Sequence, residues 1–274
     1  MRSAVDLKRV EIEPKRSSLY VSPIVWKGDP VGHVGESDVF FFVLTGECYL
    51  EIEDEVHIVR SGELAFLPMG KRRRYTQTSR SFALYEISFS ASVGGENLMA
   101  ALGFAEENFV VGGVDAAELK RLFEASARVE MQKDPIQHLS ACVNTLSLIR
   151  IYCEARARLD SDDRVALLPI TKYMSEHLGE DITLSDLSSI ACASPTYFIR
   201  KFRAAYGTSP MSHLGQLRIY KAMSYLSGTD MPIEDIASAV GIHEASYFAR
   251  VFKKHTGATP TEYRLAFKTY GGIR

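Results

Sequence analysis

The sequence predicts an α+β protein with two domains, an antiparallel β-sandwich or β-barrel followed by an all-α domain. Three observations predict this order. Short apolar segments of strand length, broken by Gly, Pro and acidic turns, run to about residue 111. From Asp115 onward, apolar residues recur at helical spacing. Beyond residue 164 the chain repeats itself.

We place the β-domain at residues 1–112 and identify its strands as runs in which apolar residues are continuous or alternate. Turns such as Glu53-Asp54-Glu55 and Pro68-Met69-Gly70 separate these runs. The expected strands are Val39–Leu44, Cys48–Glu53, His57–Val59, Leu64–Leu67, Arg72–Gln77 and Phe82–Phe89.

The composition is that of an ordinary globular protein, with 46% hydrophobic and 24% charged residues among 274. The best apolar run, Val39–Leu44, is much shorter than the roughly 18–20 residues that a bilayer requires. Met1–Arg16 is charged and lacks the apolar stretch of a signal peptide. The four cysteines are scattered and suggest neither a zinc site nor a disulfide framework. We therefore expect a cytoplasmic protein without a membrane partner.

The formal net charge of −2 hides an asymmetry. From Ile170 onward there are 12 Lys and Arg against 9 Asp and Glu, a net of +3, and the remainder, with 20 against 25, carries −5. The basic character lies at the C-terminal end, which is where a nucleic-acid partner, if there is one, would be expected to bind. An excess of +3 over about a hundred residues is modest, and alone it decides no function.

Residues 113–160 predict helices. Asp115 has the position of an N-cap, and Leu119, Leu122 and Phe123 follow at helical spacing. A second helix, Ile136–Leu159, carries an apolar stripe of Ile136, Leu139, Val143, Leu146, Ile149 (or Leu148) and Cys153. The stripe packs the helix against the β-domain, or part of it pairs with a second copy of the chain, and the two interpretations are compatible. The polar segment after Leu159 predicts a linker over 161–169.

The last domain, residues 170–274, contains one pattern twice. At an offset of 50 residues, Tyr197-Phe198 aligns with Tyr247-Phe248, and the same offset relates Arg200 to Arg250, Phe202 to Phe252, Gly207 to Gly257 and Pro210 to Pro260. Upstream the offset is 49, because the turn of the second copy has one extra residue.

Each copy has the parts of a helix-turn-helix: a short helix (Ser185–Ala191, Glu234–Val240), a tight turn and a second helix. We call the copies module 1 (about 183–206) and module 2 (about 232–256). Ser194 followed by Pro195 is typical of the N-cap and first residue of a helix. Phenylalanines four residues apart share a face in each second helix, so we expect them in the core. Gly207 and Gly257 stand where a left-handed C-cap is required.

The opposite face of each second helix carries polar residues at i, i+4 and i+7. They are Thr196, Arg200 and Arg203 in module 1, and Ser246, Arg250 and Lys253 in module 2. One such face could be a solvated charged surface, but two copies of it favour a base-reading surface, because an arginine fork can bind guanine O6 and N7 together. Lys201, Lys254 and His255 lie off that face and are candidates for phosphate contacts.

These residues resemble the AraC/XylS-type bacterial transcription regulators over Ile170–Ala266. The resemblance rests on the paired modules, on the segment Ser246–Arg264, and on the joining helix, where Arg218 and Ala222 stand at the family's arginine and alanine. It implies that two recognition helices, Pro195–Ala205 and Ala245–His255, enter successive major grooves on one side of double-stranded DNA.

Carried over by position, the resemblance implies roles for single residues. Bases would be faced by Thr196, Ile199 and Arg200 in the first helix and by Ala245, Ser246 and Arg250 in the second, with Ser194 and Arg218 among the phosphate contacts. Cys192 and His213 depart from the family's usual glycine and tyrosine. Ile199 stands where a polar residue is common, so it is a candidate for contact with a thymine methyl group.

The first domain resembles the family's sensor domain, a cupin-like barrel followed by dimerising helices, on Phe40–Gly46, Gly62–Pro68 and Tyr85–Phe89. The resemblance implies a homodimer, a small-molecule effector and RNA polymerase as a partner. Metal-binding cupins present His-x-His with a following Glu, whereas His33 and His57 are isolated here, so we expect no metal.

Arg73 stands where sensor domains of the family often have a histidine that points into the barrel. With Lys71, Arg72 and Arg74 it could be surface or DNA-facing charge. Alternatively, strand alternation buries Arg73 and Tyr75 in the barrel mouth, with Trp26, Tyr49, Phe66 and Phe82 as apolar liners. A buried guanidinium requires an anionic partner, which could be Glu86, Glu47 or a ligand carboxylate. The hypothesis is therefore a small anionic effector.

The function that these observations favour is a sequence-specific transcription regulator whose N-terminal domain gates its DNA binding. One alternative keeps the DNA binding and replaces the effector by a protein partner on the sensor domain. Another is a cupin-type isomerase or dioxygenase with a DNA-binding tail. Neither a metal triad nor a nucleophile–base pair is visible, so we expect no enzyme and no cofactor.

Overall fold

The computed structural model describes residues 7–22, 32–53, 55–77, 81–104, 110–127, 134–160 and 163–270. The chain divides into two compact units, Met1–Arg158 and Leu159–Arg274. The first combines antiparallel sheets with helices and the second is all-α, which confirms the predicted α+β class. Across the described ranges, no helix is long and apolar enough to cross a membrane.

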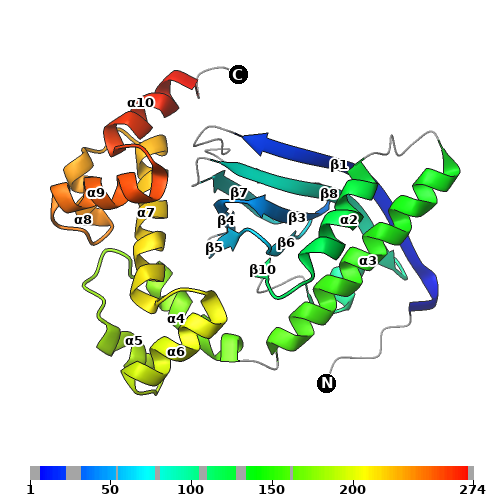
Figure 1. Ribbon diagram of the computed structural model, residues 1–274, viewed down its shortest axis with the longest axis horizontal. Helices are drawn as coiled ribbons and strands as arrows, with labels where there is room; N and C mark the ends of the chain where they lie inside the picture. Colours follow the sequence, from blue (N-terminus) through cyan, green and yellow to red (C-terminus); the bar gives the residue numbers. More distant parts are fainter. Residues whose placement is uncertain are drawn as a thin grey trace. The chain divides into compact units, whose positions relative to one another are not determined.

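The first unit contains two antiparallel sheets (Figure 1). The larger has the strand order β1-β8-β3-β6-β10, with β9 paired to β8, and the smaller has the order β2-β7-β4-β5. The strands are β1 Val10–Ser22, β2 His33–Val34, β3 Asp38–Thr45, β4 Glu47–Ile52, β5 Glu55–Arg60, β6 Leu64–Leu67, β7 Arg72–Gln77, β8 Phe82–Val93, β9 Glu96–Asn97 and β10 Val110–Val111. A 3-10 turn, Leu7–Arg9, precedes β1 and a short helix, α1 (Leu98–Ala101), follows β9.

Alternation along β3 shows how the layers stack. The ring of Phe40 lies 5.4 Å from that of Tyr152 in the helix α3 (Pro135–Asp160). The next residue points to the opposite face, and the ring of Phe41 lies 6.4 Å from that of Tyr75 in β7. The larger sheet therefore has a helical layer on one face and the smaller sheet on the other, with α2 (Ala116–Ala127) also in the helical layer (Figure 1).

Strand β1 was not expected from the sequence. It runs antiparallel along β8 from Val10 opposite Val93 to Ser22 opposite Phe82, with a register shift at Pro14. Proline lacks an N–H donor and is tolerated at a bulge of an edge strand, which is the place of β1 in the sheet. Its charged residues Glu11, Glu13, Lys15 and Arg16 are exposed, and charges on an edge strand oppose pairing with another chain.

The helical layer has a capped and buried part, as its sequence predicted, and an apolar part that is exposed. Asp115 caps α2, its Oδ1 accepting from the backbone N–H groups of Ala117 and Glu118. In α3, the side chains of Leu148, Ile149 and Tyr152 are buried in the unit. The first turns of the stripe are exposed instead: 76% for Ile136, 63% for Leu139, 54% for Val143 and 43% for Leu146.

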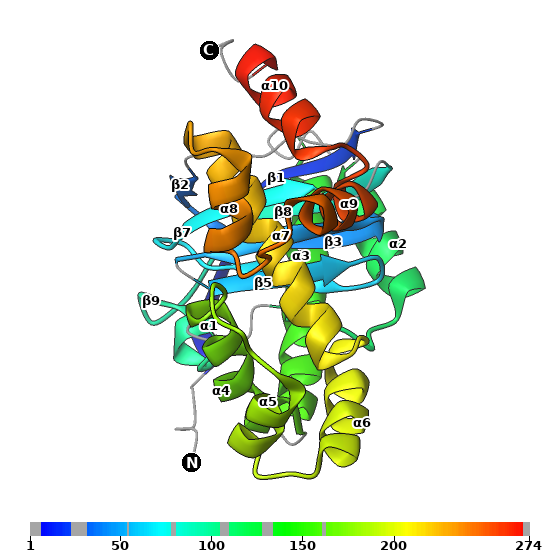
Figure 2. The ribbon, with the colours of Figure 1, turned by 90° about the vertical axis from the view of Figure 1, so that its left-hand side faces the viewer.

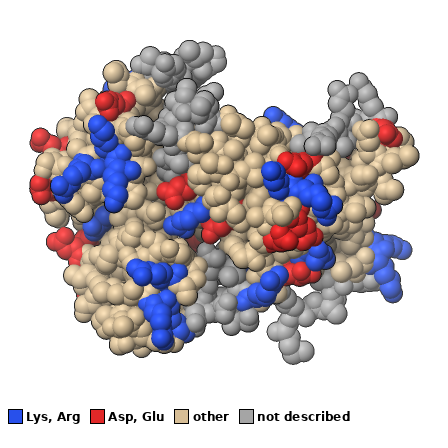
Figure 3. Space-filling model, viewed as in Figure 1, with Lys and Arg blue, Asp and Glu red and all other residues tan. Residues whose placement is uncertain are grey.

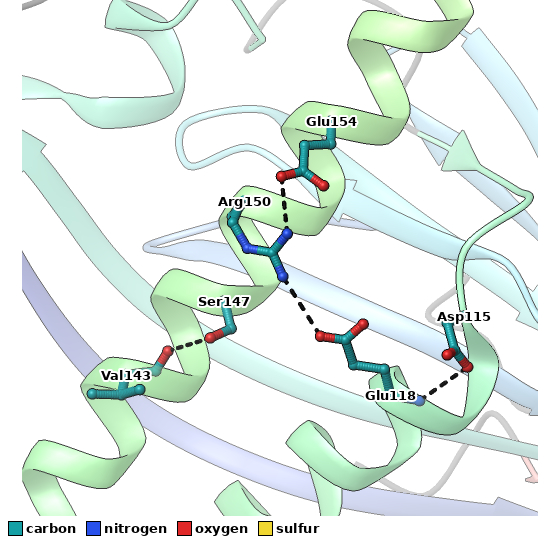
Figure 4. Close-up of polar contacts among 6 residues, drawn as sticks. All are labelled: Asp115, Glu118, Val143, Ser147, Arg150 and Glu154. Carbon is teal, nitrogen blue, oxygen red and sulfur yellow. Dashed lines mark hydrogen bonds and ion pairs between the residues drawn. The ribbon is translucent and has the colours of Figure 1, made fainter.

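Beyond Leu146 the outer face of α3 becomes charged. Arg150 bridges Glu154 on its own helix, at 2.9 Å, and Glu118 on α2, at 3.5 Å (Figure 4). Glu118 also lies at the start of α2, where its backbone N–H donates to Asp115. The exposed apolar stripe is therefore bounded by an ion network that joins the two helices.

The second unit consists of seven helices in its described part: α4 Asp163–Glu176, α5 Leu184–Ile190, α6 Pro195–Tyr206, α7 Pro210–Gly228, α8 Ile233–Ala239, α9 Ala245–Thr256 and α10 Pro260–Tyr270. The helix α7 joins a group of α4, α5 and α6 at one end to a group of α8, α9 and α10 at the other (Figures 1 and 2). The predicted linker 161–169 extends too far, since α4 begins at Asp163 and buries Leu167, Ile170 and Met174 at helical spacing.

Candidate nucleic-acid interface

Each module is a helix-turn-helix with its own core. In module 1, α5 leads through a short turn to α6, and in module 2, α8 leads to α9. The paired phenylalanines of α6 (Phe198, Phe202) and α9 (Phe248, Phe252) are at most 1% exposed, as predicted. Both second helices end at a glycine in the left-handed conformation, Gly207 with φ 69° and Gly257 with φ 79°. The two recognition helices are therefore held by equivalent packing.

The outer face of each recognition helix is open. All six residues of the predicted reading face are exposed, and these are Thr196, Arg200, Arg203, Ser246, Arg250 and Lys253. Ala245 is also exposed, whereas Ile199 is half-buried. Side chains at i, i+4 and i+7 lie along one side of a helix, so each module presents one short row of hydrogen-bonding and guanidinium groups.

Two tyrosines extend this face, and the sequence interpretation had assigned them no role. The Cζ of Arg200 lies 5.3 Å from the ring centroid of Tyr197, and the Cζ of Arg250 lies 5.4 Å from that of Tyr247. The Nζ of Lys201 lies 5.0 Å from the Tyr197 ring. A cation over an aromatic face is attracted by the ring, so these tyrosines restrict the arginines to one side. The repeated Tyr-x-x-Arg spacing was the signal that could have identified them.

The starts of the recognition helices differ. The Ser194 side chain makes no capping hydrogen bond, and it is exposed at the beginning of α6. In module 2 the hydroxyl of Ser246 donates to the carboxylate of Glu244, an exposed residue that precedes α9. Glu244 thus adds a carboxylate acceptor to this end of the reading face, and a carboxylate can accept from the amino group of cytosine.

The predicted phosphate contacts fall into two groups. Lys254 is exposed, and Lys201 and His255 are half-exposed beside the recognition helices. Arg218 differs, because its guanidinium is half-buried and donates to carbonyl oxygens of the chain itself, those of Leu178 and Glu180. Burial lowers the pKa of Arg218 from its ordinary value.

On the face of the molecule seen in Figure 3, the basic side chains of the second unit do not merge into one patch. In the view of Figure 3, Lys and Arg over the helices of the second unit form separate groups, with acidic and uncharged surface between them. This agrees with a net of +3 from Ile170 onward, 12 basic against 9 acidic residues. A net charge this small provides little long-range attraction to a polyanion.

In the first unit, Arg73 is buried and is not a surface charge. It is 8% exposed on β7, and its Nη1 donates to the carbonyl oxygens of Ser37, at 3.3 Å, and Leu67, at 3.1 Å. A Cβ on Gly35 would lie only 2.5 Å from the Arg73 Cζ, so the chain closes directly over the guanidinium. Burial lowers the pKa of Arg73, and the carboxylates of Glu86 and Asp38 oppose this shift.

Asp38 belongs to the same cluster. Its Oδ1 accepts from the Met69 backbone N–H at 2.8 Å and its Oδ2 accepts from the Asn97 amide at 2.7 Å. Burial nevertheless raises the pKa of Asp38 above its ordinary value. Of the anionic partners expected for Arg73, Glu86 lies within electrostatic reach, while Glu47 is paired with Arg60 at 3.7 Å.

The other expected effector residues are only partly brought together. Tyr75 lies opposite Leu50 and Arg73 opposite Ile52, so these two share a face of the smaller sheet. Tyr49 is fully buried, but it lies opposite Thr76 and therefore points to the other face of the smaller sheet. The prediction that Tyr49 lies beside Arg73 was wrong. Trp26 lies outside the described residues.

Two other residues that were expected to line the site around Arg73 lie elsewhere in the first unit. Phe66 belongs to the helix-facing side of the larger sheet, 5.4 Å from Tyr152. Phe82 is buried beside Tyr20 of β1, at 6.3 Å between ring centroids. The part of the chain that the structure describes contains no group of three or more His, Cys, Asp or Glu side chains placed to hold a metal.

Comparison with known proteins agrees with this geometry. The helix-turn-helix domain family matches residues 187–266. The bifunctional transcriptional activator/DNA repair enzyme AdaA of Bacillus subtilis is 39% identical over 106 residues, which are 38% of this chain and 50% of that protein. The arabinose operon regulatory protein of Escherichia coli is 38% identical over 94 residues, which are 34% of this chain and 32% of that protein.

A solved structure is similar over the same part. The C-terminal domain of the two-component response regulator yesN from Fusobacterium nucleatum is 32% identical, with coverage of 35% of this chain and 93% of that one and a TM-score of 0.34. The chain belongs to the AraC/XylS family of helix-turn-helix transcription regulators. Its second unit carries the helix-turn-helix domain that these regulators share.

The similarity has a defined extent. The chain spans half or less of the length of the two curated relatives. The match to AdaA covers the helix-turn-helix part, so it says nothing of the repair activity in that relative's name.

Proposed function

We propose that this regulator reads a bipartite DNA site, with α6 and α9 in successive major grooves. The observation that carries the proposal is the equivalence of their outer faces, on which Arg200 and Arg250 are both exposed and both lie over a tyrosine ring. A reading helix requires side chains that project from one side and end in planar donors. Two helices with the same arrangement in one unit fit a site of two segments.

Within this proposal the residues divide by the part of DNA that they contact. Bases are read by Thr196, Ile199, Arg200, Arg203, Ala245, Ser246, Arg250 and Lys253. Phosphates are bound by Ser194, Lys201, Lys254 and His255. Ile199 is half-buried, so its contact would be with an apolar group such as the thymine methyl. RNA polymerase is the partner that a regulator bound in this way would act on.

The test compares variants on a duplex selected by the protein from a randomised pool. Arg200→Ala or Arg250→Ala should weaken binding to that duplex by about 1–3 kcal/mol and relax its preference at the contacted positions. Lys201→Ala should weaken binding to all duplexes alike and reduce the salt dependence by about one phosphate contact. Lys172→Ala, an exposed lysine of α4, is the matched control. Identical behaviour of the arginine and lysine variants would refute the assignment of faces.

We also propose that the exposed stripe on α3 pairs with the same stripe of a second copy. Ile136, Leu139, Val143 and Leu146 form one row, and the charged network around Arg150 bounds it (Figure 4). A contiguous apolar row on a protein surface marks an interaction site, and two identical rows can cover one another around a twofold axis. Two copies would let four recognition helices bind one operator.

The dimer is tested by the double variant Leu139→Glu, Val143→Glu in analytical ultracentrifugation. We expect a dimer for the parent chain and a monomer for the variant, because charges opposed across an apolar interface are not solvated. Gln137→Glu, on another side of the same helix, is the control and should leave the dimer intact. A monomeric parent chain at micromolar concentration would contradict the proposal.

Finally, we propose that the first unit, as a cupin-like barrel, gates DNA binding through a small effector held near Arg73 and Tyr75 between the two sheets. The support is that these two side chains share the face of β7 that is turned to the larger sheet, and that Arg73 supplies a buried positive charge. An anionic group would have to compete with Glu86 and Asp38 for that charge. Because protein groups already surround Arg73, control by a protein partner is the second candidate.

Calorimetric titration with carboxylates, sugars and neutral aromatic compounds distinguishes the two. A carboxylate that binds the parent chain and the control Arg72→Ala, but binds Arg73→Lys at least tenfold more weakly, would support the effector. Binding of neutral compounds alone, unchanged in Arg73→Ala, would contradict an anionic effector. The absence of any binding would favour a protein partner.

A further inference from the structure

The two modules contact one another away from α7. The loop between α4 and α5 lies against the end of α8 and the turn of module 2. A Cβ on Gly179 would lie 2.9 Å from the carbonyl oxygen of Ala239, and a Cβ on Gly241 would lie 2.6 Å from that of Leu178. Separations below 3.0 Å leave no room for a side chain at either glycine. The chain that enters module 1 is therefore packed backbone to backbone on module 2.

Arg218 of α7 occupies the junction. Its Nε donates to the carbonyl oxygen of Leu178 at 3.0 Å, and its Nη2 donates to that of Glu180 at 2.6 Å. The same Nη2 would lie 2.7 Å from a Cβ on Gly241. One guanidinium thus joins the helix between the modules, the loop before module 1 and the turn of module 2.

The chemistry of the junction suits a guanidinium. Arginine offers several N–H donors in a planar fork, so it can hold two carbonyl oxygens at a set separation, whereas the ammonium of lysine is a compact point charge on a flexible stem. Asp181 and Tyr247 place negative potential near Arg218 and oppose the effect of burial on its pKa. An additional pair, His243 with Asp181 at 3.5 Å, is largely exposed and contributes little.

The elements held by this junction lead directly to the reading faces. Glu180 lies three residues before Thr183, which caps α5, and Gly241 lies four residues before the first residue of α9. A change at the junction would therefore alter the separation and the angle between α6 and α9 without a change in either module's core.

We propose that Arg218 is a positioning residue that sets the spacing at which the two recognition helices meet DNA. This inference rests on the proposed reading of a bipartite site, and it replaces a phosphate contact by Arg218 as the residue's main role. Its consequence is selectivity for spacing: the protein accepts one distance between the two DNA segments, and loss of the junction relaxes that requirement.

The DNA test uses the full chain and duplexes selected by the parent protein, in which one or two base pairs are added or removed between the contacted segments. The parent should lose at least tenfold in affinity for a change of one base pair. Arg218→Met and Arg218→Lys should bind the original duplex about tenfold more weakly than the parent does. When the spacing is altered, the affinity of each variant should fall by less than a further threefold. Gly179→Ala should flatten the profile in the same way with the charge unchanged, and Lys221→Met, an exposed lysine of α7, should behave as the parent.

A phosphate contact predicts a different pattern. Arg218→Lys would then keep its affinity, and Arg218→Met would weaken all spacings by one factor with a smaller salt slope. That pattern, or a spacing profile unchanged in Arg218→Lys and Gly179→Ala, would overturn the proposal.

A measurement without DNA separates this inference from the proposed reading. Spin labels at Ala204→Cys and Lys254→Cys, in a chain with Cys142, Cys153 and Cys192 changed to Ser, report the distance between the exposed ends of α6 and α9. The distribution should be narrow in the parent and broad in Arg218→Lys and Gly179→Ala. Equal widths would overturn the role of Arg218 whether or not the protein selects a DNA site.

Discussion

The turns of the two modules share a backbone conformation but use different residues to adopt it. Cys192 has φ 48° in module 1 and Gly241 has φ 73° in module 2. The left-handed region favours glycine, and other residues occupy it at a cost of about 1–2 kcal/mol. Cys192 is exposed, whereas Gly241 is buried against Leu178 and Arg218. The helix-turn-helix requires the conformation, and packing between the modules requires the absence of a side chain in only one of them.

The modules also differ in the aromatic residue that packs against the second phenylalanine of the recognition helix. The second phenylalanine of each recognition helix meets an aromatic ring of the following helix, His213 at 5.4 Å from Phe202 and Tyr263 at 5.5 Å from Phe252. His213 and Tyr263 are buried to 6% and 4% exposure. The histidine at a position where tyrosine is common in the family therefore still supplies the aromatic contact that the core requires.

The core is where the two modules should respond alike. Phe202→Ala and Phe252→Ala should each destabilise their module by about 3–5 kcal/mol, because each removes a ring with 0% exposure and leaves a cavity. Amide hydrogen exchange in α6 and α9, followed by mass spectrometry, measures the two losses separately. A loss below about 1 kcal/mol in either module would contradict the equivalence of the cores.

The turn is where the modules should respond differently. Gly241→Ala should destabilise the second unit by about 2–5 kcal/mol, since strain of about 1–2 kcal/mol in the left-handed region adds to about 1–3 kcal/mol of overpacking. Cys192→Ala keeps a residue with a Cβ at an exposed site and should change stability by no more than about 0.5 kcal/mol. Thermal unfolding of both variants measures this difference in stability. Equal losses would show that packing at the junction does not make the turn of module 2 more sensitive than that of module 1.

Local patterns predicted much of this unit. The spacing of Phe198 and Phe202, the glycines at the helix ends and the polar row of each recognition helix are set within one or two turns, so the sequence alone identified them. Contacts between distant segments could not be predicted in this way. Arg218 and Leu178 are 40 residues apart, and nothing in the residues around either one indicates that the loop before module 1 reaches α7.

The first unit shows the same division. The runs around Phe40 and Leu64 predicted strands because both faces of the larger sheet are covered and the runs are almost wholly apolar. Strand β1 escaped prediction, because its charged alternate residues and Pro14 resemble a polar terminus until it is paired with β8. The sequence allowed Arg73 to lie either in the interior or on the surface. Its hydrogen bonds to the carbonyl oxygens of Ser37 and Leu67 show that it lies in the interior.

A smaller difference lies at the start of each first helix. Thr183 and Asp186 form a capping box on α5, while the N-cap of α8 is Pro232 and makes no side-chain capping bond. Thr183→Ala should cost about 1 kcal/mol, and Pro232→Ala should cost less, because no capping bond is lost. The hydrogen bonds from Thr183 lower the pKa of Asp186, so their contribution is present above the carboxyl's unfolded pKa and is lost as pH falls through the folded value. Hydrogen exchange in α5 against α8, at neutral and acidic pH, tests both statements, and equal costs would remove the asymmetry.

The smallest expected effect concerns the tyrosine rings beside the reading arginines. Tyr247→Leu should weaken binding to the selected duplex by about 0.5–1 kcal/mol, because Arg250 loses its aromatic neighbour, and Tyr247→Phe should retain most of that energy. In module 1 both Arg200 and Lys201 lie over Tyr197. Tyr197→Leu should therefore also weaken binding to unrelated duplexes and change the salt slope, whereas Tyr247→Leu should affect the selected duplex most. Fluorescence anisotropy titrations at two salt concentrations measure these terms. A Phe variant as weak as its Leu variant would assign the effect to the tyrosine hydroxyl instead of the ring.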